Sequence, residues 1–144
     1  MSVSHILKLK GRDVITVLPG LTVKAVAELL AAKHIGAVIV SSGGGSIEGI
    51  VSERDIVRAI GATGAAALDR PIASVMTKNV RTCSEDDSEM GLMALMTQHR
   101  IRHLPVAVDG KLSGMISIGD VVKFRIEEIE RDAADMKAYI AGSS

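Results

Sequence analysis

The sequence predicts a mixed α/β (α+β) fold of two tandem β-α-β-β-α units, packed with pseudo-twofold symmetry and followed by a long C-terminal helix. The first observation is a repeated phrase: residues 49–60 (GIVSERDIVRAI) and 114–126 (GMISIGDVVKFRI) share one pattern of glycine, apolar pair, serine and aspartate. The second is that further positions align when the chain is shifted by about the same amount. The third is that apolar runs and helical spacing alternate in the same order in both halves.

Internal duplication explains the alignment. Residues 14–40 align with 80–106 at an offset of 66, and residues 49–55 align with 114–120 at an offset of 65. The offset changes between the stretches SSGGGSIE and AVDGKLS, two glycine-containing turns in which a change of length costs little. The two halves are therefore expected to have the same elements in the same order.

Local patterns predict the elements of the first half. A short strand at 14–17 meets the turn PGLT, and a helix follows with apolar residues at helical spacing: Val23, Val26, Ala27 and Leu30. The apolar run 37–40 predicts a strand, and the glycine-rich turn before 47–51 predicts a hairpin. A second helix begins after Ser52.

The second half is predicted in the same way. A strand at 80–83 precedes a helix that carries Leu92, Met93 and Met96. Strands at 103–108 and 112–116 form a hairpin, and a helix begins after Ser117. The stretch GATGAAALDRPIASVMTKN is predicted to be the linker between the halves.

These patterns place the first repeat at residues 10–66, the second at 73–128 and the C-terminal helix and tail at 129–144. Neither repeat has enough apolar surface to be stable alone, so we expect them to pack together. The last helix carries a heptad-like stripe: Val122, Ile126, Ile129, Ala133, Met136 and Ile140. The stripe either covers the helix's own domain or contacts a second copy, and both interpretations remain open.

Composition narrows the class of protein. The chain has 144 residues, 47% apolar and 24% charged, with 17 Lys plus Arg against 17 Asp plus Glu. This balance disfavours nucleic acid as a partner, because nucleic-acid binders carry a basic excess. No apolar run reaches the roughly 18–20 residues that cross a bilayer, and the N-terminus lacks the pattern of a signal peptide. We expect a cytoplasmic protein with no membrane association.

The motif Ser-x-x-Asp occurs in both halves, as Ser52 with Asp55 and as Ser117 with Asp120. A serine followed by an acidic residue three positions later is a helix capping box. A carboxylate beside a helix N-terminus can also accept hydrogen bonds from a ribose 2′,3′-diol, while backbone N–H groups and an arginine such as Arg54 bind phosphate. One side chain can serve both purposes.

Basic residues gather before the strand at 103–108. Arg100, Arg102 and His103 either interact with a helix C-terminus or bind phosphate, and both interpretations remain open. The four histidines have no cysteine or carboxylate at metal-ligand spacing, which disfavours a metal site. No nucleophile–base pair is recognisable, so we expect no enzymatic activity.

The duplicated unit resembles the CBS domain. Each copy ends in G-h-x-[ST]-x-x-D, where h is apolar, and an I-x-x-L-P-V strand precedes the second. The stretches VMTKNVRT and RIRHLPV…GKLSGMISIGD are especially similar to stand-alone bacterial CBS-pair proteins. The resemblance extends from about Lys10 to Glu128 and identifies two CBS repeats that form a CBS pair, or Bateman module.

This resemblance implies a non-enzymatic regulatory module that binds an adenosine-containing nucleotide in clefts between the repeats. The expected ligand is AMP or NAD(H), with ATP, ADP and S-adenosylmethionine as alternatives, bound as a regulatory ligand and not as a catalytic cofactor. The resemblance also implies a homodimer, and it names no downstream protein target. The alternative function is a structural adaptor or dimerisation protein without a physiological nucleotide.

The resemblance also implies roles for individual residues. Those expected to bind ribose or phosphate are Ser52, Arg54, Asp55, Arg102, His103, Ser117 and Asp120. Those expected around the adenine are Lys10, Thr16, Ala37, Val38, Thr77, Thr82, Leu104 and Pro105. Repeat two has Gly119 where repeat one has Arg54, so we expect the first cleft to prefer a larger or more charged ligand such as NAD. The second cleft would then suit AMP, with Arg102 and His103 supplying charge.

Overall fold

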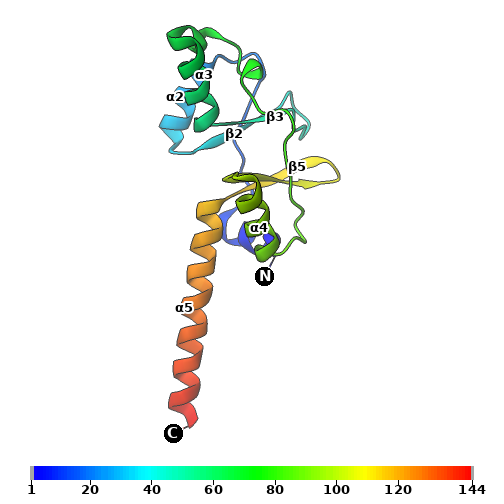
Figure 1. Ribbon diagram of the computed structural model, residues 1–144. Coiled ribbons are helices and arrows are strands. Elements are labelled where there is room, and N and C mark those ends of the chain that lie inside the picture. Colours follow the sequence, from blue (N-terminus) through cyan, green and yellow to red (C-terminus); the bar gives the residue numbers. More distant parts are fainter. Residues whose placement is uncertain (1, 144) are drawn as a thin grey trace.

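The computed structural model describes residues 2–143, which form two small α/β units and a helix that projects from them (Figure 1). The elements in chain order are α1 (Val3–Lys10), β1 (Thr16–Val17), α2 (Val23–Lys33), β2 (Ala37–Val40), β3 (Gly49–Ser52), α3 (Glu53–Thr63), the 3₁₀ helices η1 (Gly64–Asp69) and η2 (Ile72–Ser74), α4 (Glu89–His99), β4 (His103–Val108), β5 (Lys111–Ser117) and α5 (Ile118–Ser143). The mixed α/β class and the long C-terminal helix are thereby confirmed.

The two sheets have related topologies. In the first, β1 pairs with β2 in parallel and β2 pairs with β3 in antiparallel fashion. In the second, β4 and β5 form an antiparallel pair, and Cys83 alone stands in the place of β1, bridging Val106 in parallel. The predicted strand at 80–83 is therefore wrong as an element. Arg81 and Thr82 are both exposed, so this segment lacks the alternating buried face that stabilises a strand.

Helix ends repeat between the halves. Thr22 caps α2 by accepting a hydrogen bond from the Ala25 N–H, and Ser88 caps α4 by accepting one from the Gly91 N–H. Both helices end in a residue with left-handed backbone, His34 (φ 54°) and Arg100 (φ 52°). These end residues lie at equivalent positions of the duplicated sequence, so the duplication is preserved in backbone geometry.

The N-terminal helix α1 was not among the predicted elements. Its residues Val3, Ile6 and Leu7 are almost fully buried and belong to the hydrophobic core of the second half. The linker, in turn, packs on the first half: Ile72 is fully buried there, and Thr77 pairs with Ile50 at the edge of β3. Each half is thus completed by a segment that lies outside its own β-α-β-β-α order.

Helix α5 leaves the body of the molecule soon after it begins (Figure 1). Val121 and Phe124 are its buried apolar residues among those described, and both belong to the core of the second half. The side chains of residues 130–142 are exposed. Among residues 2–143, no helix combines the length and apolar character that crossing a membrane requires.

Candidate functional site

A cavity of about 510 Å³ opens where the two halves meet, and we call it the Asp55 cleft. It is lined by Gly36, Ile50, Ser52, Glu53, Arg54, Asp55, Arg58, Thr77, His99, Arg100, Ile101, Arg102 and His103. The first half contributes the N-terminus of α3 and the edge of β3. The second half contributes the end of α4 and the start of β4.

Asp55 forms the capping box that its spacing predicts. The Ser52 N–H donates to Asp55 Oδ2 at 2.8 Å, and the Ser52 hydroxyl donates to the same oxygen at 3.1 Å. The other carboxylate oxygen, Oδ1, accepts a longer hydrogen bond of 3.5 Å from the Thr77 hydroxyl. One oxygen therefore holds the helix, while the second is weakly engaged and lines the cleft.

Four arginines line the same cleft from both halves: Arg54, Arg58, Arg100 and Arg102. Within residues 2–143, none of the four takes part in an ion pair. A neighbouring hollow of about 450 Å³ shares Arg54, Arg100 and Arg102 with the cleft. Four guanidinium groups around the N-terminus of a helix make this a site that favours an anion with several oxygens.

His103 lines the cleft next to Gly36. A Cβ atom added to Gly36 would lie 3.0 Å from His103 Cε1, so the ring occupies the space that only glycine leaves. Burial lowers the pKa of His103 below 6.5, and the charges of Lys10 and Arg102 act in the same direction. The imidazole is thus a neutral hydrogen-bonding group at neutral pH and not the cation that the sequence suggested.

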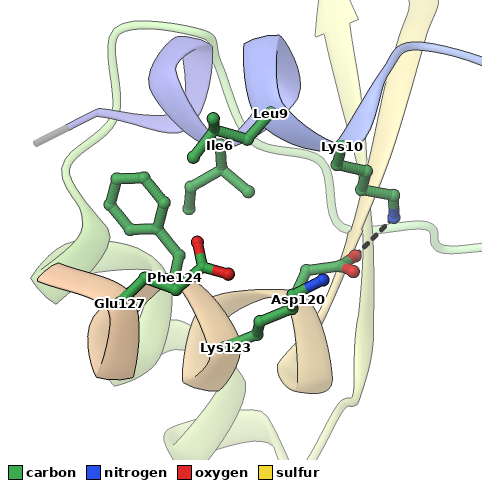
Figure 2. Close-up of a pocket in the computed structure, with 7 residues that line it drawn as sticks. All are labelled: Ile6, Leu9, Lys10, Asp120, Lys123, Phe124 and Glu127. Carbon is green, nitrogen blue, oxygen red and sulfur yellow. Dashed lines mark hydrogen bonds and ion pairs between the residues drawn. The ribbon is translucent and has the colours of Figure 1, made fainter. Parts of the chain in front are cut away.

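The equivalent site of the second half is built around Asp120. The Ser117 N–H donates to Asp120 Oδ2 at 2.8 Å, and the Asp120 N–H donates to the Ser117 hydroxyl at 3.1 Å. Here the carboxylate is paired with the Lys10 ammonium (Figure 2). The same ammonium donates to the Met115 carbonyl. Burial acts to raise the pKa of Asp120, but the hydrogen bond from Lys10 and those from Ser117 lower it overall.

A second cavity of about 420 Å³ lies beside this ion pair, between α1 and α5, and we call it the Asp120 cleft (Figure 2). It is lined by Ile6, Leu9, Lys10, Asp120, Lys123, Phe124 and Glu127. Its lining carries two carboxylates as well as two ammonium groups. It is therefore less cationic than the Asp55 cleft.

The structure brings together some of the residues expected to bind a nucleotide and separates others. The Asp55 cleft contains Ser52, Arg54, Asp55, Thr77, Arg102 and His103. The Asp120 cleft contains Lys10 and Asp120, with Ser117 adjacent to the latter. The remaining six do not line either cleft: Ala37, Val38, Leu104 and Pro105 are buried in the sheets, while Thr16 and Thr82 are exposed.

Sequence reasoning did not assign Gly36 or Arg58 to a site. Arg58 follows Arg54 by one helical turn, so its position on the same face could have been recognised from spacing. Gly36 could not have been found in this way, because its importance comes from contact with His103 in the other half.

Cys83 lies outside both clefts. Burial raises the pKa of the Cys83 thiol to about 12, so it remains protonated and unreactive. In the part of the chain that the structure describes, no group of three or more His, Cys, Asp or Glu side chains is placed to hold a metal ion.

Comparison with known proteins identifies relatives of both halves. The family model of the CBS domain matches residues 3–62 and 72–127. A mitochondrial CBS domain-containing protein from Arabidopsis thaliana is 34% identical over 113 residues, which cover 76% of this chain and 55% of that relative. The chain thus spans about half the length of this curated relative.

Solved structures extend the comparison to three dimensions. The crystal structure of a CBS-domain containing protein from Agrobacterium tumefaciens is 46% identical, with a TM-score of 0.84, covering 87% of this chain and 99% of that one. A CBS domain protein from Pyrobaculum aerophilum, complexed with AMP, is 28% identical, with a TM-score of 0.73, covering 83% of this chain and 89% of that one.

Proposed function

The chain belongs to the CBS domain family, and from this premise we propose that it is a regulatory module that binds an adenosine-containing nucleotide in the Asp55 cleft. The nucleotide acts as a signal and is not consumed. The site offers groups for recognition, namely a carboxylate, arginine side chains and the N-terminus of a helix.

One observation carries this proposal: a carboxylate at a helix N-terminus lines the same cleft as four arginines from both halves, none of which forms an ion pair within residues 2–143. Asp55 Oδ1, whose one hydrogen bond within the described residues is the long bond from Thr77, would accept hydrogen bonds from a ribose diol. The phosphate would then lie among the arginines and the first N–H groups of α3.

AMP is the ligand with the most direct support. The relative from Pyrobaculum aerophilum was crystallised with AMP. NAD(H) is the second ligand we propose, because the hollow beside the cleft shares three of the arginines and could receive a second phosphate. For NAD(H) this keeps the expectation that the cleft with Arg54 takes the more highly charged ligand. Proposing AMP for the same cleft departs from the expectation that AMP binds the second cleft, because Arg102 and His103 line the Asp55 cleft.

The Asp55 cleft should fill before the Asp120 cleft. A ribose that approached Asp120 would share the carboxylate with the Lys10 ammonium, which is paired with Oδ2. Because this ion pair already neutralises the carboxylate charge, a hydrogen bond from the ribose to Asp120 would contribute less than one to Asp55. A mononucleotide would therefore bind the Asp120 cleft more weakly.

Calorimetric titration with AMP and with NADH tests the proposal. Asp55→Ala should weaken binding by about 10- to 100-fold, because hydrogen bonds to a charged group contribute roughly 1.5–3 kcal/mol. Asp120→Ala is the matched control, since it removes the equivalent capping carboxylate. Asp120→Ala should leave the dissociation constant of the tighter binding event within about twofold of the wild-type value.

The competing function is a structural adaptor whose clefts hold no physiological nucleotide. If none of AMP, ADP, ATP, NADH and S-adenosylmethionine gives a binding heat with the wild-type protein, the nucleotide-binding proposal is refuted in favour of the adaptor function. Equal losses in Asp55→Ala and Asp120→Ala would instead show that the two clefts are occupied alike, against the order of filling proposed above.

A further inference from the structure

Helix α5 is much longer than its own domain needs. It has 26 residues, and an α-helix of that length extends about 39 Å. Beyond Glu128, the side chains of residues 129–142 are all exposed. An isolated helical segment of about 15 residues is only marginally stable in water, so a regular helix here calls for a packing partner.

The apolar stripe of α5 faces away from the domain. Its exposed fractions are 47% for Val122, 51% for Ile126, 52% for Ile129, 61% for Met136 and 60% for Ile140, and Ala133 is also exposed. Val121 and Phe124, on another side of the helix, are the residues that enter the core. The stripe therefore does not cover its own domain, which removes one of the two interpretations of its spacing.

The charges that flank the stripe are complementary to a second copy of the same helix. In heptad terms, Ile126 and Ala133 occupy a positions, and Ile129 and Met136 occupy d positions. Residues at g precede each a position, and residues at e follow each d position. In a parallel pair, each g residue lies beside the e residue five positions later in the partner.

These flanking positions carry opposite charges in both available pairs. Arg125 at g would lie beside Glu130 of the partner subunit. Asp132 at g would lie beside Lys137 of the partner subunit. Twofold symmetry doubles each pair, which gives four attractive contacts along two heptads.

An antiparallel pair does not satisfy the same sequence. When the whole stripe overlaps, Glu130 lies beside Glu130 of the partner subunit, and Asp132 beside Asp132 of the partner subunit. Shifting the antiparallel pair by one heptad in either direction brings opposite charges together, but it leaves one end of the stripe outside the contact, either Met136 and Ile140 or Val122 and Ile126. Only the parallel arrangement covers the stripe and pairs the charges.

We propose that α5 forms a parallel, in-register, two-stranded coiled coil with α5 of a second copy of this chain. The contact is distinct from the nucleotide clefts, because none of their lining residues belongs to the stripe. The protein is then a dimer whose two bodies lie at the same end of a shared stalk.

A charge-swap experiment tests the parallel register. Asp132→Lys and Lys137→Asp each place like charges side by side twice per dimer, and each should raise the dimer dissociation constant about tenfold in sedimentation equilibrium. The double variant restores opposite charges, and its dimer dissociation constant should lie within about threefold of the wild-type value. Residues five apart are not neighbours on one helix, so this restoration reports on contact between chains.

Disulfide trapping gives an independent readout. In a parallel coiled coil, d residues face their own counterparts, so Met136→Cys should form a covalent dimer on oxidation with diamide. Asp135→Cys, one residue away and pointing off the stripe, is the matched control and should remain monomeric on a denaturing gel. Cys83 does not interfere, because it is buried and its raised pKa keeps the thiol protonated.

The proposal is overturned if the wild-type protein sediments as a monomer at tens of micromolar concentration. It is equally overturned if a dimer forms but the double charge swap fails to recover affinity. Cross-linking of Asp135→Cys as readily as Met136→Cys would assign the contact to another face of α5. Circular dichroism of each variant checks that the body remains folded.

Discussion

His103 lies at the contact between the two halves, and its protonation is coupled to folding. Burial is the largest cause of its lowered pKa, followed by the nearby charge of Lys10. Asp120 and Glu53 act in the opposite direction, and Arg102 lowers the pKa further. The folded protein therefore binds a proton at this ring less readily than the unfolded chain does.

This lowered pKa predicts a loss of stability in mild acid. The unfolded chain takes up the proton near pH 6.5, whereas the folded chain does so at lower pH, so the free energy of unfolding should fall as pH drops below about 6.5. His103→Gln should reduce this loss in urea unfolding between pH 7.5 and 5.5. His34→Gln, which replaces an exposed histidine, is the control.

We expect His103→Gln to reduce the pH dependence of the free energy of unfolding and His34→Gln to leave it unchanged. If His34→Gln flattens the pH dependence as much as His103→Gln does, burial at the contact between the halves is not the cause. The ion pair of Lys10 with Asp120 does not contribute to this comparison. The pKa of Asp120 is lowered below 3.8, so the carboxylate does not titrate in the pH range of the unfolding experiment.

Residues that act through local spacing could be predicted, and those that act across the chain could not. The capping boxes of Ser52 with Asp55 and of Ser117 with Asp120 span three residues, so their pattern is readable directly. The pairing of Lys10 with Asp120 joins residues at opposite ends of the chain. No local pattern encodes such a contact, and the state of the second cleft depends on it.

Helix α1 shows the same limit at the level of an element. Val3, Ile6 and Leu7 are spaced as on one helix face, but eight residues give too short a pattern to distinguish a helix from a loop. What stabilises α1 is its packing on the second half. A Cβ at Gly114 would lie 2.8 Å from Leu7 Cδ2, so the Leu7 side chain packs against β5 at a position where only glycine leaves enough space.

Truncating Leu7 should destabilise the whole second half. Leu7→Ala removes a side chain that is 1% exposed, and such changes cost about 2–5 kcal/mol in a core. Leu9→Ala, on the same helix but 64% exposed, should change the free energy of unfolding by less than about 0.5 kcal/mol. Urea unfolding followed by circular dichroism measures both. Equal effects would mean that α1 is not anchored through Leu7.

Longer elements were predicted more reliably than short ones. Helices α2 and α4 have capping residues at both ends, and strand β4 lies where its apolar run predicts it. Of the strand predicted at 80–83, the structure contains only the single bridge of Cys83. Its neighbours Arg81 and Thr82 are both exposed and do not pack on the core. Duplication suggested a full strand there, but burial decides whether a strand extends.

At the scale of the whole molecule, the Asp55 cleft depends on both halves. Asp55 and Arg54 come from the first half, and Arg100 and Arg102 come from the second. A nucleotide that contacted both sets would bind only when the halves are correctly packed. Its binding free energy would therefore add to the stability of the folded chain.

Thermal unfolding should reveal this coupling. AMP at 100 times its dissociation constant would add about 2.7 kcal/mol to the free energy of unfolding, which for a chain of this size raises Tm by roughly 5–10 °C. Arg102→Ala removes an exposed cation from the second half and should shrink the shift at the same AMP concentration without lowering Tm in its absence. Adenosine, which lacks the phosphate, should give a smaller shift than AMP in the wild-type protein and the same shift in both proteins.

This pattern separates a sensor from an adaptor because only a sensor couples the halves through a ligand. A ligand changes the balance between two arrangements of the halves only if it binds one of them more tightly. If AMP stabilises wild type and Arg102→Ala equally, Arg102 does not contact the phosphate, and the coupling of the halves through this side chain is refuted. If AMP shifts Tm only while Arg102 is present, the phosphate joins the two halves, and nucleotide concentration controls their packing.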